Sequence, residues 1–450
     1  MKITIYSTGG NDPDSLHSAV HSFYPTRAED WDRVALMYPE HSFTVCCCVS
    51  EGHLVDVEGS KVLSRPEKVK TIILPLDADL GELARIIAST KPDVAYAAPL
   101  PNVAYDWNPL RDAMVGEELR KRGICVICPE VSLAEAAFEK NKTAELLRKH
   151  GFSTAKGVYV QMSLYRAEEK NSIILNNVYR EYILRQIDDL RFPVIVKAAS
   201  GAGSVGLSVA ETKERLEEIL LSGDPNADVM VEEKLEGENF GIEIYGVPGA
   251  YRVYEPILFT TAKEGITDPF ASIKYGPVRS RKYKLEELRA QMLSMAEALC
   301  FRGGVELDLI FHGGEWTVVD LNPRFSLLSQ MVGATADKSV PQLIAEAAIG
   351  GLSPADPGEL KLAVDFKTRP ASREELKRLR TDFPSVRSVL SFRLGITETE
   401  TVSYSEIDVG GFEDNAQLLR ELERISEKYG DLVTSGIVER IREMIKGLEA

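Results

Sequence analysis

The fold follows from one stretch, Gly304-Val-Glu-Leu-Asp308-Leu-Ile-Phe-His-Gly-Gly-Glu-Trp-Thr-Val-Val-Asp320-Leu-Asn322-Pro-Arg324. Two apolar runs flank its Gly-Gly pair, and apolar runs joined by a glycine turn are typical of a β-hairpin. In such a hairpin, Asp308 and Asp320 can face each other across neighbouring strands. Asn322 then lies on the same strand face as Asp320, because side chains alternate between the two faces of a strand.

These side chains predict a metal site. Magnesium prefers hard oxygen ligands and usually takes one or two carboxylates, leaving its other positions to water and phosphate oxygens. We expect Asp308, Asp320 and the amide oxygen of Asn322 as ligands of Mg²⁺, with Mn²⁺ as the alternative ion. Asp308 lies in a run that is apolar on both sides, where carboxylates are rarely buried unless they are paired or bind a metal. Solvated charges at the strand ends are the competing interpretation.

A second signal lies about a hundred residues upstream, where an apolar run ending in Lys197-Ala-Ala precedes Ser200-Gly201-Ala-Gly203-Ser204-Val-Gly206. The glycines match GxGxxG, but a dinucleotide-binding fingerprint must open a helix. Here the loop runs into a second short strand, residues 207–210. A glycine-rich hairpin with a lysine on its first strand suits a cover over phosphates, with backbone N–H groups and one point charge. A flexible hairpin with a surface lysine is the plain alternative.

A third segment is the apolar strand that begins at Val229 and turns acidic at Glu232-Glu233-Lys234-Leu235. Backbone groups at its end could meet an adenine edge. Glu238 or Glu243, just downstream, could accept hydrogen bonds from ribose hydroxyls.

In this order, the segments resemble the ATP-grasp superfamily between about residues 132 and 351. The resemblance implies an α/β and α+β fold with an N-terminal parallel-sheet domain over residues 1–130. It also implies an ATP-grasp domain over residues 131–352, with its lid at about residues 156–230. Residues 353–450 are expected to form a small C-terminal α+β unit whose function the sequence does not reveal.

The resemblance also implies roles for single residues. Lys197 resembles the lid lysine that contacts ATP phosphates, and Lys140 resembles the family's earlier phosphate-contacting lysine, with Lys142 as a competing assignment. Residues 232–235 resemble the adenine hinge. Lys274 lies in a stretch similar to the mobile loop of D-alanine:D-alanine ligase, and the resemblance implies that it contacts the nucleotide. Arg324 resembles the arginine of the Asn-Pro-Arg motif, placed to stabilise an acyl phosphate and the tetrahedral species that follows.

An ADP-forming ligase that joins a small-molecule carboxylate to an amine is therefore expected, with ATP and Mg²⁺. The pattern is closest to amino-acid or peptide ligases of the Asn-Pro-Arg type. Biotin carboxylase is disfavoured because the Gln-Val-Glu-His continuation is missing after Arg324, and a simple cell-wall ligase because Glu306 stands where that enzyme has arginine. A non-catalytic nucleotide-binding protein and a nicotinamide oxidoreductase are the alternatives.

The composition limits the partners. The chain has 450 residues, 44% of them apolar, and a formal net charge of −16, which disfavours binding to a nucleic-acid backbone. No run of roughly 18 apolar residues predicts a membrane span, so a cytoplasmic protein is expected. We interpret the six cysteines as reduced thiols, and we expect Cys125-Val-Ile-Cys128 to lie in the buried core. An extra polar stretch at residues 162–191 could dock a partner subunit, and a homodimer stays open.

The first 130 residues alternate strands and helices, which predicts a parallel sheet with crossover helices, including a helix near residues 13–23. Ligands of such sheets lie at the carboxyl ends of the strands. Ser7, Gly9 and Gly10, and the later segment 102–106, are therefore the residues that could meet the acceptor substrate.

Overall fold

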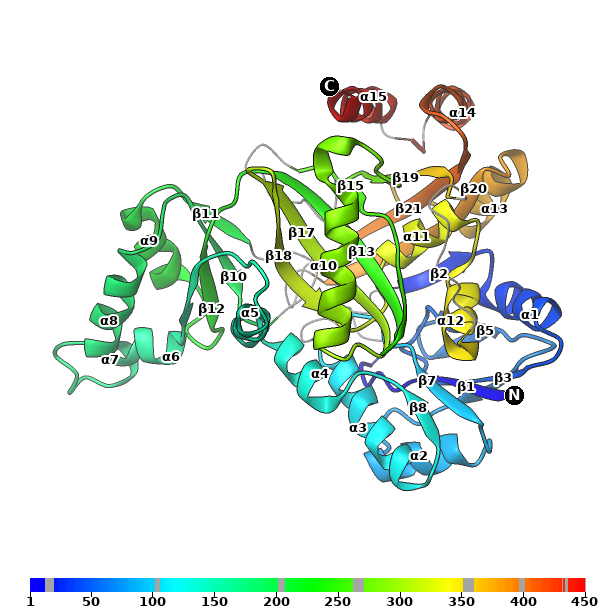
Figure 1. Ribbon diagram of the computed structural model, residues 1–450, viewed down its shortest axis with the longest axis horizontal. Coiled ribbons are helices and arrows are strands. Elements are labelled where there is room, and N and C mark those ends of the chain that lie inside the picture. Colours follow the sequence, from blue (N-terminus) through cyan, green and yellow to red (C-terminus); the bar gives the residue numbers. More distant parts are fainter. Residues whose placement is uncertain are drawn as a thin grey trace.

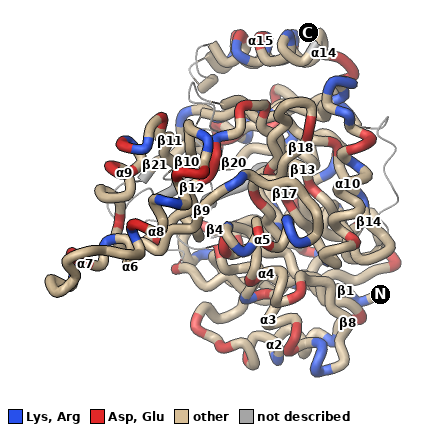
Figure 2. Tube along the Cα trace, turned by 60° about the vertical axis from the view of Figure 1, so that its left-hand side comes forward, with Lys and Arg blue, Asp and Glu red and all other residues tan. Residues whose placement is uncertain are grey.

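The computed structural model describes residues 1–12, 20–101, 106–200, 207–261, 271–350, 360–395, 401–430, 432–433 and 436–449. Within these ranges it contains a parallel sheet near the N-terminus and antiparallel sheets beyond it (Figure 1), so the predicted mixture of α/β and α+β structure is confirmed. Acidic and basic residues are interspersed along the chain (Figure 2). None of the helices in the described ranges combines the length and the hydrophobicity needed to span a bilayer.

The N-terminal sheet has the strand order β6-β3-β1-β7-β8, and its neighbouring strands are parallel. Its strands are β1 (Lys2–Ser7), β3 (Ser42–Cys47), β6 (Lys70–Ile73), β7 (Val94–Ala97) and β8 (Cys125–Ile127). Ile3 and Ile5 of β1 pack into one hydrophobic cluster and Tyr6 into another, so both faces of the sheet are covered. The covering helices are α1 (Arg27–Met37), α2 (Leu80–Ala88), α3 (Asn108–Lys121) and α12 (Val340–Ile349).

The predicted helix near residues 13–23 is wrong in its last part. Val20–Tyr24 forms strand β2, which pairs with β20 (Val386–Gly395), while residues 13–19 lie outside the described residues. A short Val-His-Ser-Phe-Tyr run has strand propensity, and a partner more than 360 residues away in sequence decides its state. A small hairpin of β4 (Asp56–Glu58) and β5 (Lys61–Ser64) was also not predicted.

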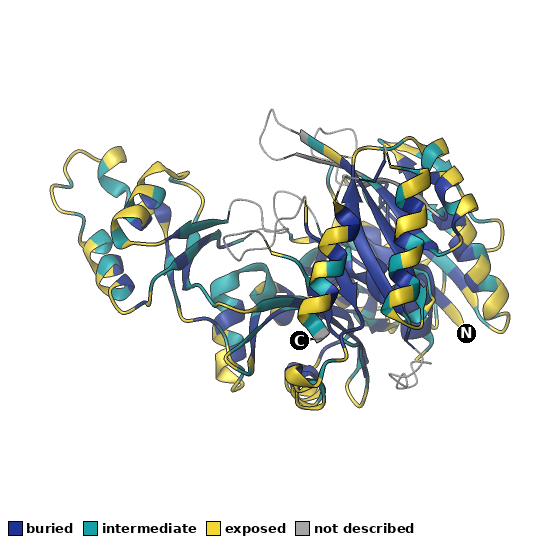
Figure 3. Ribbon diagram, turned by 90° about the horizontal axis from the view of Figure 1, so that it is seen from above, coloured by how far each residue is buried: buried dark blue, intermediate teal, exposed yellow. Residues whose placement is uncertain are grey.

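A four-stranded antiparallel sheet with its own helices projects from the body of the molecule, at the left of Figures 1 and 3. Its strands, in the order β11-β10-β12-β9, are β9 (Gly157–Val160), β10 (Val194–Ala198), β11 (Ser208–Ala210) and β12 (Val229–Glu233). The helices are α6 (Met162–Tyr165), α7 (Ala167–Lys170), α8 (Val178–Ile187) and α9 (Lys213–Ser222). A separate hydrophobic cluster around Val196, Leu216 and Val231 stabilises this unit.

The largest sheet runs through the centre of the molecule in the order β18-β17-β13-β15-β16-β19-β21-β20-β2, with β14 paired to β13. Its remaining strands are β13 (Glu238–Val247), β14 (Ala250–Val253), β15 (Ile257–Phe259), β16 (Lys274–Gly276), β17 (Gly303–His312), β18 (Glu315–Asn322), β19 (Leu362–Thr368) and β21 (Thr401–Phe412). The strands after residue 360 thus continue the sheet that holds the β17–β18 hairpin, because β16 pairs with β19.

The two faces of this sheet differ in chemistry. Phe240, Ile242 and Leu307 lie on one face and join the main hydrophobic cluster. Helices α10 (Leu285–Ala298), α13 (Arg373–Asp382), α14 (Asn415–Lys428) and α15 (Ile437–Glu449) contribute to the same cluster. The opposite face carries Gly241, Glu243, Glu306 and Asp308, because side chains alternate along β13 and β17.

Small residues on the polar face let helix α11 (Leu328–Ala336) lie close to the sheet. A Cβ atom added to Gly241 would come within 2.6 Å of Leu328 Cδ2, and one on Gly410 within 3.1 Å of the Ala334 oxygen. Helix α11 follows directly on the Asn-Pro-Arg segment. Its close packing therefore fixes Arg324 against the end of β18.

Candidate functional site

The β17–β18 hairpin presents the acidic residues as the sequence predicted. Asp308 pairs with Asp320 and Glu306 with Asn322 across the two strands, with a shift in register directly after Asp308. All four side chains share the polar face of the sheet, while Leu307 and Leu321 are buried on the other. Alternation places Glu306 with Asp308 and Asp320 with Asn322, and the shift in register brings the two pairs to one face.

Negative charge is in excess at this place. Burial in the surrounding protein, then Glu306 and Asp320, raise the pKa of the Asp308 carboxyl well above its usual range. Burial also raises the pKa of Glu306, against the lowering effect of Arg324, and raises that of Glu243 to about 8. A divalent cation would offset this charge, so the donor set fits the Mg²⁺ that we expect.

The proposed magnesium ligands are two carboxylates and one amide. Among the described residues, no group of three or more His, Cys, Asp or Glu side chains is arranged to hold a metal ion by itself. A magnesium ion at Asp308 and Asp320 would therefore need water and phosphate oxygens for its remaining positions, which is its usual behaviour in nucleotide sites.

Two lysines from other elements reach the same region. Lys197 on β10 lies with its Nζ atom 2.6 Å from Glu232 Oε2 and donates to the Val319 oxygen at 3.4 Å. Lys140, the first residue of α5 (Lys140–Lys149), lies with its Nζ atom 3.3 Å from Asp320 Oδ2. The backbone N–H of Lys140 also donates to the Ala199 oxygen at 2.9 Å, directly before the glycine-rich loop.

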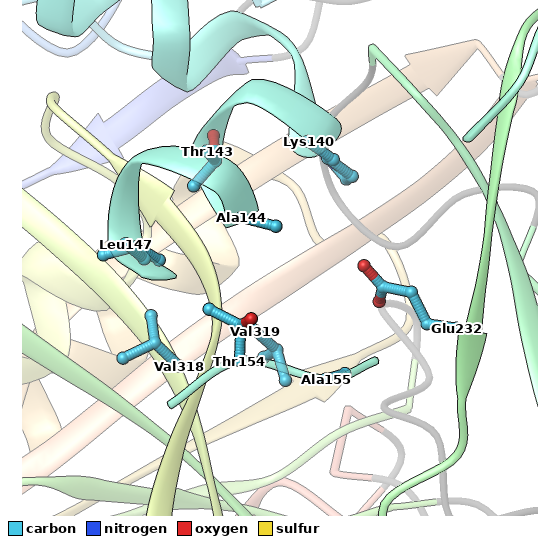
Figure 4. Close-up of a pocket in the computed structure, with 9 residues that line it drawn as sticks. All are labelled: Lys140, Thr143, Ala144, Leu147, Thr154, Ala155, Glu232, Val318 and Val319. Atoms are coloured by element: carbon cyan, nitrogen blue, oxygen red, sulfur yellow. The ribbon is translucent and has the colours of Figure 1, made fainter. Parts of the chain in front are cut away.

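A pocket lies between these elements, and Figure 4 shows the side chains of Lys140 and Glu232 among those that line it. It is lined by Lys140, Thr143, Ala144, Leu147, Thr154, Ala155, Glu232, Val318 and Val319. The lining combines apolar side chains with one cation and one carboxylate. Lys142 points elsewhere, because its Nζ atom pairs with Glu139 at 2.8 Å and with Glu135.

The remaining hinge residues lie beside the pocket on β12 and after it. Glu233 pairs with Arg191 at 3.2 Å, and the Lys234 N–H donates to the Pro193 oxygen at 3.0 Å. Leu235 follows Lys234 in the connection to β13. Ser200 follows Ala199, whereas Gly201, Gly203, Ser204 and Gly206 lie outside the described residues.

The two candidates for a ribose contact differ in position. Glu238 accepts hydrogen bonds from Lys282 at 3.0 Å and Tyr283 at 2.8 Å, at the start of β13. Glu243 lies five residues farther along the strand, is 2% exposed, and accepts a hydrogen bond from Ser329 at 2.6 Å. Glu243 thus belongs to the acidic group around Glu306 rather than to the hinge.

Lys274 is held apart from the two pocket lysines. Its Nζ atom lies 3.1 Å from Asp365 Oδ1 and pairs with Glu406, on the far side of β15 and β16 from the hairpin. Burial alone would lower the pKa of Lys274, but Asp365 and Glu406 raise it above its usual range. The sequence resemblance placed this lysine at the nucleotide, whereas the structure gives it two buried carboxylate partners from β19 and β21.

The substitution Lys274→Met distinguishes a role of Lys274 in stability from a role in nucleotide binding. Lys274→Met is expected to lower the free energy of unfolding by about 3–5 kcal/mol, because it leaves Asp365 and Glu406 buried without their cation. Urea denaturation measures this loss. Lys361→Met, which removes an exposed pair with Glu413, is the control and should cost under about 1 kcal/mol. A stable variant whose KM for ATP rises instead would return Lys274 to the nucleotide site.

Arg324 is surrounded by acceptors. Its Nε atom donates to Asp106 Oδ2 at 2.5 Å, Nη1 to Glu306 Oε2 at 3.0 Å and Nη2 to Asn322 Oδ1 at 3.0 Å. The side chain is 6% exposed. Asn322 therefore has a second contact besides its expected metal role, and Asp106 connects the hairpin to the N-terminal sheet.

The carboxyl end of that sheet carries buried polar groups. Ser7 donates to Glu51 Oε2 at 2.7 Å, and the Thr8 N–H donates to Asp112 Oδ1 at 2.8 Å. Burial raises the pKa of Glu51 to about 7 and that of Asp112 to about 8. The Phe325 N–H donates to the Pro99 oxygen at 3.1 Å, so this edge of the sheet lies next to the Asn-Pro-Arg segment.

Sequence reasoning missed some of these residues. Thr154 and Ala155 line the pocket but stand in no motif. Asp365, Glu406 and Asp408 carry the signal that singled out Asp308, a carboxylate inside an apolar strand, and could have been found by it. Glu51 and Asp112 follow a strand and lie in a helix, respectively, and have no comparable signal.

Comparison with known proteins agrees with this geometry. Residues 158–322 match the family described as the D-Ala-D-Ala ligase C-terminus. The fold resembles an ADP complex of N5-carboxyaminoimidazole ribonucleotide synthetase, with a TM-score of 0.61, 13% identity, and coverage of 94% of this chain and 96% of that one. L-amino acid ligase from Bacillus licheniformis aligns with a TM-score of 0.59, 13% identity, and coverage of 95% and 97%.

The chain has an ATP-grasp fold. The segments that carried the resemblance in the sequence, the Lys197 strand and the Asp320–Arg324 run, lie close together, because Lys197 Nζ donates to the oxygen of Val319, the residue before Asp320. The expected fold is therefore confirmed.

A curated relative of this chain is the carbamoyl phosphate synthase large chain of Methanocorpusculum labreanum, 24% identical over 227 residues. That match covers 47% of this chain and 21% of the relative. The chain thus spans about a fifth of the length of this much larger protein.

Proposed function

We propose that this ATP-grasp protein is an ATP-dependent, ADP-forming ligase that joins a carboxylate to an amine, with an amino acid or peptide as the product class. The observation that carries the proposal is the convergence of Lys140 and Lys197 on the strand end that holds Asp320, opposite Asp308. Two cations and two carboxylates from separate elements are what a triphosphate and its magnesium ion need.

In the proposed reaction, the substrate carboxylate attacks the γ-phosphate of ATP, and ADP leaves. Lys140 and Lys197 neutralise the phosphate oxygens from fixed positions, so little reorganisation is needed when charge develops. Magnesium, held by Asp308, Asp320 and Asn322, supplies further neutralisation of the phosphates when bound. The carboxylates of the hairpin would hold that ion at the edge of β18.

The second half-reaction forms the C–N bond. An amine attacks the carbonyl carbon of the acyl phosphate, and inorganic phosphate leaves. Arg324 stabilises the oxyanion that develops on the carbonyl oxygen, because a guanidinium donates two parallel N–H groups to such oxygens. The acceptor would enter from the carboxyl edge of the N-terminal sheet, which contacts the Arg324 segment through Pro99 and Phe325.

The proposal predicts ADP release that depends on a carboxylate. The purified protein is incubated with ATP, Mg²⁺ and pairs drawn from a panel of amino acids and small carboxylates, and ADP and phosphate are measured. Hydroxylamine, added in place of the amine, is expected to trap the acyl phosphate as a hydroxamate. ATP binding without ADP release for any pair would instead support a nucleotide-binding protein without catalysis.

A further inference from the structure

Asp106 makes the most unusual contact in the site. It lies between β7 and α3, 218 residues before Arg324 in sequence, and its Oδ2 atom accepts a hydrogen bond from Arg324 Nε at 2.5 Å. Its side chain is 12% exposed and that of Arg324 is 6% exposed. The contact is therefore a largely desolvated pair between the N-terminal domain and the catalytic segment.

Asp106 is the second carboxylate that contacts Arg324, which carries a single positive charge; Glu306 is the first. Glu306 Oε2 accepts from Nη1 at 3.0 Å, and the Asn322 amide oxygen accepts from Nη2 at 3.0 Å. Both of these partners belong to the same hairpin as Arg324, so they orient the guanidinium in any state of the site. Asp106 alone comes from outside the hairpin, from the connection between β7 and α3.

With these partners in place, the Nε donor of Arg324 is not open to a substrate. A guanidinium has five N–H donors, and here Nε donates to Asp106, Nη2 to Asn322, and Nη1 to Glu306 and, at 3.4 Å, to the Phe325 oxygen. A substrate group that binds Arg324 through Nε must therefore displace Asp106. A carboxylate can replace Asp106 with the same charge and the same geometry toward the guanidinium.

We propose that Asp106 occupies the position of the substrate's carboxyl group at Arg324, and that a carboxylate substrate displaces it. This inference rests on the proposed ligase function. Asp106 thereby acts as a specificity residue: a neutral molecule cannot compete with it for the guanidinium, whereas a carboxylate of similar reach can. It also keeps the charge of Arg324 neutralised while no carboxylate is bound, which suppresses ATP turnover without substrate.

Asp106→Asn tests the displacement, because it keeps the size and one oxygen of the side chain but removes its charge. We expect the KM for the carboxylate substrate to fall about tenfold, since one competing charge-assisted hydrogen bond is weakened. ADP release without any carboxylate is expected to rise several-fold over the wild-type rate. Asp106→Glu, which restores the charge, should return both quantities toward the wild type.

Asp77→Asn is the matched control, the same substitution at an exposed aspartate of the same domain. It should change neither quantity. A merely structural contact predicts another pattern: kcat and the melting temperature of Asp106→Asn would fall, while the KM for the carboxylate would stay the same or rise. That result would overturn the inference.

A second measurement needs no turnover. Trp107 follows Asp106 and is 49% exposed, while Trp31 and Trp316 are buried. With ADP and Mg²⁺ present, adding the carboxylate to the wild type is expected to change the fluorescence of Trp107, and Trp107→Phe should abolish the change. In Asp106→Asn the same change should reach its midpoint at about one tenth of the carboxylate concentration, in line with the tenfold lower KM.

The same measurements distinguish failure of the ligase proposal from failure of the inference about Asp106. If the ligase proposal were wrong, no carboxylate would stimulate ADP release in the wild type or in Asp106→Asn, and the inference would fall with it. If instead wild-type ADP release depends on a carboxylate and the KM of Asp106→Asn is unchanged, the ligase stands and the role of Asp106 alone is refuted.

Discussion

Lys197→Met is expected to reduce ATP-dependent ADP release by about a hundredfold to a thousandfold. The Nζ atom of Lys197 lies between Glu232 and the Val319 oxygen, at the side of the pocket next to Asp320. The substitution keeps the length of the side chain but removes the charge that would meet the phosphates. Losing one preorganised charged donor to a developing negative charge has an effect of this size.

The measurement is kcat and KM for ATP, with the carboxylate saturating. Lys197→Arg should keep part of the activity, because it retains a charge that reaches the pocket. Lys213→Met serves as the control, since Lys213 pairs with Asp188 on the outer side of the same unit and should behave as the wild type. Glu232 loses its partner in Lys197→Met, so the melting temperature must be recorded as well. A folded variant with wild-type kcat and KM would remove Lys197 from the site.

The contacts around Lys197 also show what the sequence could predict. The apolar run ending at Lys197 and the acidic end of β12 are local patterns of alternating or continuous apolar residues, and such patterns predict strands reliably. The glycine turn of the β17–β18 hairpin sets a register that alone would place Asp308 opposite Val319, and the shift in register next to Asp308 brings it opposite Asp320. The two facing carboxylates were expected from the sequence, but this shift was not. The resemblance then supplied what periodicity does not, namely that these separate strands face one another.

Contacts between distant elements were not predictable in the same way. Lys274 pairs with carboxylates from β19 and β21, and β2 pairs with β20, because the sheet extends across segments more than 90 residues apart in sequence. Nothing in the local sequence states which strand will lie beside which. The same holds for Asp106, whose segment was expected near the acceptor but whose contact with Arg324 depends on how the N-terminal sheet packs against the hairpin.

The carboxylates of the hairpin illustrate a cost that function imposes on stability. Burial, Glu306 and Asp320 together raise the pKa of Asp308 well above its usual range, so a negative charge on Asp308 is unfavourable in the folded protein without a cation. Selection for a stable fold alone would replace one of them with an apolar or amide residue. Their presence is therefore the physical argument for a cation at this position.

Asp320→Ala is accordingly expected to have opposite effects on activity and on stability. ADP release should fall by about a hundredfold or more at fixed Mg²⁺, because one of the two carboxylate ligands of the ion is lost. The protein without ligands should melt at the same or a higher temperature than the wild type, because Asp308 loses a repelling neighbour. The substitution also removes the salt bridge from Lys140 to Asp320, whose side chains are 15% and 19% exposed, and this loss offsets part of the gain.

Asp320→Glu and Glu315→Ala sharpen this test. Asp320→Glu keeps a carboxylate one methylene farther out and should keep measurable activity, with an altered Mg²⁺ concentration at half-maximal rate. Glu315 is an exposed carboxylate at the turn of the same hairpin, and Glu315→Ala should match the wild type in rate and in Mg²⁺ dependence. A readout independent of turnover is the rise in melting temperature that Mn²⁺ with ADP produces in the wild type, which Asp320→Ala should lack. If Asp320→Ala kept both that rise and the wild-type rate, the ion would bind away from β18, and the assignment of Asp308 and Asp320 would have to be abandoned.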